Sequence, residues 1–238
     1  MVKNISFTLF LLIGLFSCSK SDSFDTDPET ITESPAEEST LTMIQQYFLD
    51  VALGQEFGTG NSKLKKWTQD ISIYVDHNDQ DELIEELDSI ILEINELSNS
   101  IQLTIVSDAS EANYRIFLGP ADDYKDFEPN AAPYISQNYG LFWLYRDSQS
   151  VIYRGSMYVD TERTTELSCQ KHLLREEMTQ SLGLMNDSFE YSESIFQQDW
   201  TCTTEYSAED KMLIQYILNP ELTANMSEEE ISQYFMEN

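Results

Sequence analysis

The chain has 238 residues, of which 43 are Asp or Glu and only 13 are Lys or Arg, so its formal net charge is −30 at pH 7. Nucleic acids and anionic lipid surfaces are bound by Lys and Arg side chains that release counterions. This composition therefore excludes nucleic-acid binding, and acidity of this degree commonly keeps a secreted protein soluble.

Residues 1–17 predict a lipoprotein signal peptide. Lys3 precedes an apolar stretch from Ile5 to Phe16 that is too short to span a bilayer, and Cys18 follows directly after Leu-Phe-Ser. This ending resembles a bacterial lipobox, in which Cys18 carries the lipid of the mature protein. We expect export to the bacterial cell envelope and attachment to a membrane through Cys18. The alternative is an ordinary secretory signal that contains a Cys.

The next stretch, residues 18–40, consists mainly of Ser, Thr, Asp, Glu and Pro. It holds too few apolar residues to pack a core, so we expect a flexible acidic tether. Residues 41–238 remain, which is enough chain for a single domain with a sizeable core.

Hydrophobic periodicity predicts the early elements of this domain. Helical spacing is expected at 43–57 and at 79–97, the second with a solvated acidic face. A loop rich in acids and Pro is expected at 122–133. Strands are expected at 71–75, 101–106, 113–118, 139–145 and 151–160. This mixture of helices and strands predicts an α+β fold with a mixed sheet packed against helices.

A helix that begins near Thr164 and ends at Gly183 has two unlike faces. Its predicted core stripe consists of Leu167, Leu174, Met178 and Leu182. The opposite side carries Cys169, His172, Glu176, Gln180 and Gly183. Polar residues at this spacing are typical of a helix that holds ligands, and Asn186 and Asp187 follow just past its end.

The spacing matches the zincin helix H-E-x-x-H and its longer form that ends x-x-G-x-x-H. When the pattern is aligned on Gly183, Glu176 and Gln180 fall at the two zinc-binding positions and Glu177 falls at the general base. Asn186 or Asp187 lies near the third ligand. The strand at 151–160 directly precedes this helix, which is the order that zincin folds use.

The residue types nevertheless differ from those of a zinc site, because a Gln amide oxygen is a poor ligand at a tetrahedral zinc. Three interpretations stay open. A different divalent metal could be held by Glu176, Asp187 and His172; the helix could be free of metal and serve structure or binding; or the protein could be a hydrolase that uses carboxylates alone.

Two cysteines remain when Cys18 is assigned to the lipid. In an oxidising compartment, Cys169 and Cys202 are expected to form a disulfide. The alternative is that Cys169, three residues before His172, is a metal ligand. After residue 187 we expect an irregular stretch at 188–204 and two capped helices, at 207–218 and 227–236, that serve as scaffolding.

The segment from Glu176 to Ser188 reads E-E-x-x-Q-x-L-G-L-x-N-D-S. With Ser194-Ile195-Phe196 and with Ser207-x-x-Asp210 before Met212-Leu213, it resembles an uncharacterised bacterial lipoprotein family, a domain of unknown function placed among zincin-like peptidases. The resemblance covers about residues 70–235. It implies a zincin-like fold, a secreted or lipid-anchored setting, and that E-E-x-x-Q is the family's own pattern. It supplies no activity, and Asn225 departs from the Gly expected before Met226.

We therefore expect a lipid-anchored relative of metallopeptidases, either an atypical or an inactive enzyme. Glu177 is its candidate general base. The candidate ligands of a divalent metal such as zinc are Glu176, Gln180, Asp187 and His172. The alternative is a non-catalytic lipoprotein that binds a peptide or protein along an exposed edge of the strand at 151–160.

Overall fold

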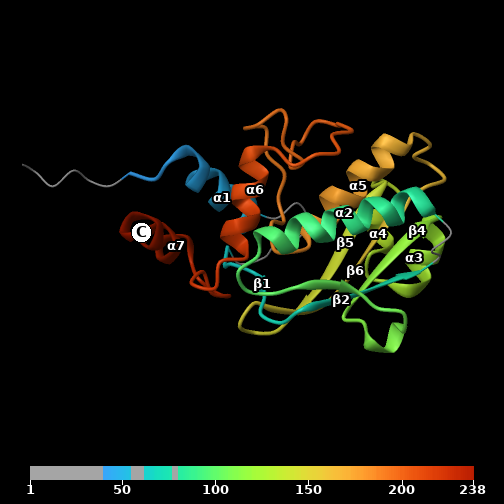
Figure 1. Cartoon of the computed structure of the whole chain (residues 1–238), viewed down its shortest axis with the longest axis horizontal. Helices are drawn as coiled ribbons and strands as arrows, with labels where there is room; N and C mark the ends of the chain where they lie inside the picture. Colours follow the sequence, from blue (N-terminus) through green and yellow to red (C-terminus); the bar gives the residue numbers. More distant parts are fainter. Residues whose placement is uncertain (1–39, 55–61, 77–79) are drawn as a thin grey trace, which may run out of the picture. The chain divides into compact units, whose positions relative to one another are not determined.

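Figure 1 shows the computed structural model of the chain, in which residues 40–54, 62–76 and 80–238 are described. The predicted signal peptide, Cys18 and nearly all of the tether lie outside the described residues. Residues 39–238 form one compact unit. In the described part of the chain, no helix is long and apolar enough to cross a membrane.

A mixed sheet of six strands forms the centre of this unit, and its main path runs in the order β1-β6-β4-β2-β3. The strands are β1 (Lys66–Trp67), β2 (Ile71–Asp76), β3 (Leu103–Ile105), β4 (Tyr114–Gly119), β5 (Gly140–Arg146) and β6 (Val151–Asp160). Only β5 is antiparallel, and it pairs with β6. The predicted strands and the mixed sheet are confirmed, whereas the short β1 was not predicted.

The strand β6 is internal, so the predicted exposed edge at 151–160 is wrong. It pairs in parallel with β4 from Gly155 to Asp160 and antiparallel with β5 on its other side. All six residues from Gly155 to Asp160 are buried, as is usual for a strand that is covered on both faces. The edge of the sheet at this end is β5.

One face of the sheet is covered by α2 (Asp81–Leu97) and α5 (Leu167–Gln180), which also pack against each other. The predicted core residues Leu174, Met178 and Leu182 of the α5 region are fully buried. Leu167 is 42% exposed, which contradicts its predicted place in the core. It is the first residue of α5, where the helix has only begun to cross the sheet.

The other face carries α3 (Ala121–Phe127) and α4 (Ala132–Ile135), so the loop predicted at 122–133 is wrong. Tyr124 of α3 stacks on Tyr158 of β6 with ring centroids 4.9 Å apart. Acids and a Pro that indicated a loop instead lie in the first turns of helices: Asp122 and Asp123 in the positive first turn of α3, and Pro133 in the first turn of α4.

Three further helices pack together beside the sheet: α1 (Met43–Leu53), α6 (Ala208–Ile217) and α7 (Glu228–Glu237) (Figure 1). Phe48 of α1 makes edge contacts with Tyr216 of α6 and Phe235 of α7, at centroid distances of 5.5 and 5.8 Å. The capping boxes predicted at Ser207 and Ser227 are present. A scaffolding role was predicted for α6 and α7 and stays a prediction.

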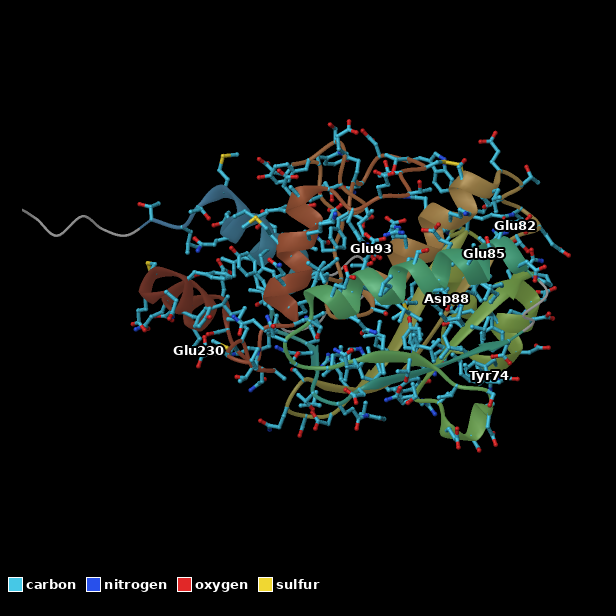
Figure 2. The ribbon with its side chains drawn as sticks, viewed as in Figure 1. Tyr74, Glu82, Glu85, Asp88, Glu93 and Glu230 are labelled. Atoms are coloured by element: carbon cyan, nitrogen blue, oxygen red, sulfur yellow. A yellow bond between two sulfur atoms is a disulfide. The ribbon has the colours of Figure 1, made fainter. Side chains whose placement is uncertain are left out.

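A buried Arg joins α5 to α2. Figure 2 shows Glu82, Glu85, Asp88 and Glu93 along α2, and the first three are exposed, as predicted for a solvated acidic face. Arg175 is only 3% exposed. Its Nη2 donates to Glu86 Oε1 at 2.6 Å and its Nη1 donates to Glu93 Oε1 at 2.9 Å. These bonds hold α5 at a fixed position on the sheet.

We predict that Arg175→Met lowers the free energy of unfolding by about 3 kcal/mol, because it leaves the buried carboxylate of Glu86 without its guanidinium. Arg154→Met is the matched control. Arg154 lies 4.0 Å from the centroid of Tyr145, much as Arg175 lies 4.4 Å from that of Tyr206, but Arg154 is exposed. We expect the control to cost less than about 1 kcal/mol. Equal denaturation midpoints for Arg175→Met and the unsubstituted protein would contradict this account.

Candidate functional site: a cleft between α5 and β5

A cavity of about 520 Å³ lies where α5 faces β5. The helix contributes five lining residues, His172, Leu173, Glu176, Glu177 and Gln180. The residues at 137–144, Arg146, Met185, Asp187 and the loop at 197–201 complete the lining. The predicted catalytic residue and the four predicted metal ligands thus all line one cleft.

Gly183 allows the chain to return to this cleft after α5. Its φ is +126°, a conformation that residues with a side chain rarely adopt, and an added Cβ would lie 2.2 Å from the Lys65 carbonyl oxygen. The turn brings Asp187 back to the helix, where its Oδ1 accepts a hydrogen bond from Gln180 Nε2 at 2.6 Å. Asn186 does not line the cleft and donates to the Asp50 carbonyl oxygen at 3.3 Å.

His172 is held at both of its ring nitrogens. Its Nδ1 lies 2.7 Å from the Thr203 carbonyl oxygen, and its Nε2 lies 3.4 Å from Glu176 Oε2. Thr203 is kept in place by the predicted disulfide between Cys169 and Cys202, which is confirmed. Because Cys169 is in this bond, the alternative that it is a metal ligand is wrong.

The pKa of His172 reflects these contacts. Burial alone would lower this pKa, because it disfavours the imidazolium. The hydrogen bond and the charge of Glu176, with the Thr203 carbonyl and the charge of Asp187, outweigh burial and raise the pKa above its ordinary value. The protonated ring donates from both nitrogens and is therefore the form that this site stabilises.

Glu177 is positioned by the beginning of β5. The side chain is 8% exposed, and a Cβ added at Gly140 would lie 2.6 Å from its Oε1. A side chain at residue 140 would therefore force the carboxylate of Glu177 to shift. A chain that lay along the cleft beside β5 would pass next to Glu177.

The opposite wall of the cleft is formed by residues 197–201, whose role was missed in the sequence. Trp200 is 58% exposed, and its ring makes an edge contact with Tyr139 at a centroid distance of 5.7 Å. This wall is tied to the start of α5 by the disulfide at Cys202. The sequence did carry one signal for this wall: Trp200 lies two residues before Cys202, the predicted disulfide partner of Cys169.

A family model for a group described as "Protein of unknown function (DUF2927)" matches residues 42–237. The chain belongs to the DUF2927 family. Two solved structures of myroilysin are also similar. One is 13% identical over 66% of this chain and 83% of that chain, with a TM-score of 0.42. The other is 11% identical, and the match covers 72% of this chain and 93% of that chain, with a TM-score of 0.44. These likenesses are too distant to assign an activity, and no curated protein matches.

The cleft of this DUF2927 protein fits zinc poorly. The amide of Gln180 is bonded to Asp187, and Glu176 is beside His172, whose two nitrogens are both engaged. Within 40–54, 62–76 and 80–238, no group of three or more His, Cys, Asp and Glu side chains is placed to hold a metal ion. A Gln amide is a poor zinc ligand, and both ring nitrogens of His172 are already engaged, so we derive no chemical step through a metal.

We predict that His172 titrates above about 6.5, the ordinary His value, and that Glu176→Gln lowers its pKa. Because the pKa of His172 is raised in the folded state, protonated His172 stabilises the fold. This contribution is complete below about pH 6.5 and is lost as the pH rises through the folded-state pKa. The chain has two His, so NMR titration of His77→Asn observes His172 alone. Glu228→Gln, on exposed α7, is the control. A pKa that Glu176→Gln leaves unchanged would contradict the assignment.

Proposed function

We propose that this protein is an exported, lipid-anchored and zincin-like relative of metallopeptidases whose cleft binds an extended peptide beside β5. In this proposal Glu177 is the general base: it takes a proton from the water that attacks a peptide carbonyl, the C–N bond breaks, and the proton passes to the leaving amine. The lipid on Cys18 would keep the cleft at a membrane of the bacterial cell envelope.

The observation that carries the proposal is the position of Glu177 against Gly140 of β5, the strand at the edge of the sheet. In the described part of the chain, β5 pairs with β6 alone, so the backbone groups of its other edge are left to other partners. Extended peptides bind such edges by adding a strand. The cleft lies along β5, and its Gly140 end meets the carboxylate.

The arrangement suits proton transfer more clearly than it suits metal chemistry. A general base in hydrolysis must come within hydrogen-bond reach of the water that it activates, and a peptide beside Gly140 would bring a carbonyl group close to such a water at Glu177. His172 is a neighbouring acid, because its contact with Glu176 favours the protonated ring. Glu177 and His172 are five residues apart, about 140° around the axis of α5, and both line the cleft.

We predict that the full chain in detergent binds peptides from a random library and cleaves some of them. Gly140→Ala should weaken binding by about tenfold or more, because the added methyl group displaces Glu177 or the strand edge. Gly119→Ala is the matched control, since a Cβ at Gly119 meets nothing within 4 Å. Affinity is measured by fluorescence anisotropy and cleavage by mass spectrometry.

Glu177→Gln should abolish cleavage and keep most of the affinity. Cleavage that persists in Glu177→Gln would exclude Glu177 as the general base, and a protein that binds no peptide would overturn the proposal. Binding without cleavage would identify the non-catalytic peptide-binding lipoprotein instead. Cleavage that is lost on chelation and restored by zinc would show that the altered ligand set still holds a metal.

A further inference from the structure

Gln180 uses only one half of its side-chain amide within the protein. The side chain is 3% exposed, and its Nε2 donates to Asp187 Oδ1 at 2.6 Å. This bond fixes which way round the amide lies, because a carboxylate accepts hydrogen bonds and only the nitrogen of the amide donates them. The amide oxygen, Gln180 Oε1, accepts no hydrogen bond from any residue that the structure describes.

This unpaired oxygen is open to the cleft. Within the described part of the chain, the side-chain atoms that are fully buried without a partner are Tyr114 Oη, Ser150 Oγ and Thr164 Oγ1. Gln180 Oε1 is not one of them, so it keeps some accessible surface. Because Gln180 lines the cavity, that surface faces the cleft.

Burial makes this acceptor different from the other carboxamides of the cleft. Gln137 and Gln198 also line it, but both are exposed and have bulk water as a partner. A nearly buried oxygen without a donor is costly, and a ligand that supplies a donor recovers this free energy. His172 and Glu176, from the same helix, are already in contact with each other.

An extended peptide beside β5 carries suitable donors. When a strand is added to the edge of a sheet, successive N–H groups of its backbone point alternately towards the edge strand and away from it. Those that point towards β5 meet the backbone groups of its outer edge. Those that point away need acceptors from the other residues that line the cleft, among which Gln180 is the buried carboxamide with a free oxygen.

We propose that Gln180 is a peptide-binding residue whose Oε1 accepts a hydrogen bond from a main-chain N–H that points away from β5. The inference rests on the proposed peptide-binding function and adds a residue that selects the ligand, because Pro at this point of the peptide lacks the donor. Asp187 is a positioning residue, since it holds the amide with its oxygen towards the ligand. A position that aligns with a zinc ligand thus carries a peptide acceptor.

The test removes one N–H of the peptide at a time. The tightest heptapeptide from the random library is remade with one ester bond in place of each amide in turn, which deletes a donor and adds no bulk. Affinities for the full chain are measured by fluorescence anisotropy before any cleavage. We expect Gln180→Met to reduce the penalty of one ester from about tenfold to less than about threefold. Esters at amides that bond to β5 should keep their penalties.

Gln170→Met is the matched control, because Gln170 is also a nearly buried residue of α5 but does not line the cleft. It should leave every ester penalty unchanged. A second variant exchanges the pair, with Gln180→Glu and Asp187→Asn together. Residue 187 then donates and residue 180 accepts as a carboxylate, so the same ester penalty should grow by about threefold. This arm does not depend on whether Gln180→Met folds.

Ester penalties that are the same in Gln180→Met and in the unsubstituted protein would overturn the inference and leave the proposed function standing. An exchanged pair that does not enlarge the penalty would also overturn it, because residue 180 would then not be the acceptor. An equal change in Gln170→Met would do the same, since a general effect on α5 would explain the result. A failure to bind any peptide would overturn both the inference and the proposed function.

Discussion

The close approach of Glu177 to the backbone of Gly140 is the constraint on which the cleft depends. An added Cβ at Gly140 would lie 2.6 Å from Glu177 Oε1, so the carboxylate keeps its present place beside the strand because residue 140 has no side chain. The bonds from Arg175 to Glu86 and Glu93 hold the helix on the sheet, and Gly183 turns the chain back towards the cleft. Each of these contacts sets where the polar face of α5 lies relative to β5.

The polar face itself is organised as a network of hydrogen bonds. At successive turns of α5, His172 meets Glu176, and Gln180 meets Asp187. Glu176 and Gln180, the two positions that the sequence pattern aligned with zinc ligands, thus each have a side-chain partner within the protein. This is the arrangement that buried polar side chains require when no ion compensates them, because an unpaired buried group is costly. Glu177 stands beside this network, where β5 begins.

Local patterns in the sequence predicted much of this site. The spacing along α5, the Gly that ends it and the pairing of Cys169 with Cys202 are properties of nearby residues or of a single pair, and the structure has them all. Strand order is different, because it depends on which long segments pair. The sequence of β6 therefore could not show that β5, and not β6, forms the edge.

Other features also required the folded chain. Arg175 looked like an ordinary charged residue of a helix, and only the packing of α2 against α5 buries it beside Glu86. Residues 197–201 have no periodic sequence pattern that could predict their structure. Their position as a wall of the cleft comes from the disulfide and from the contact of Trp200 with Tyr139. The α3 and α4 segment was misread because acids and Pro mark both loops and the first turns of helices.

Hydrogen–deuterium exchange of the full chain, with and without a bound peptide, tests the central claim that β5 is the peptide-binding edge. The account predicts slower exchange of amides at 140–146 and at 197–201 when peptide is present. The added strand forms hydrogen bonds with β5 and is covered by residues 197–201. The opposite edge of the sheet, β3, should exchange at an unchanged rate. Protection at β3, or none at β5, would contradict the account.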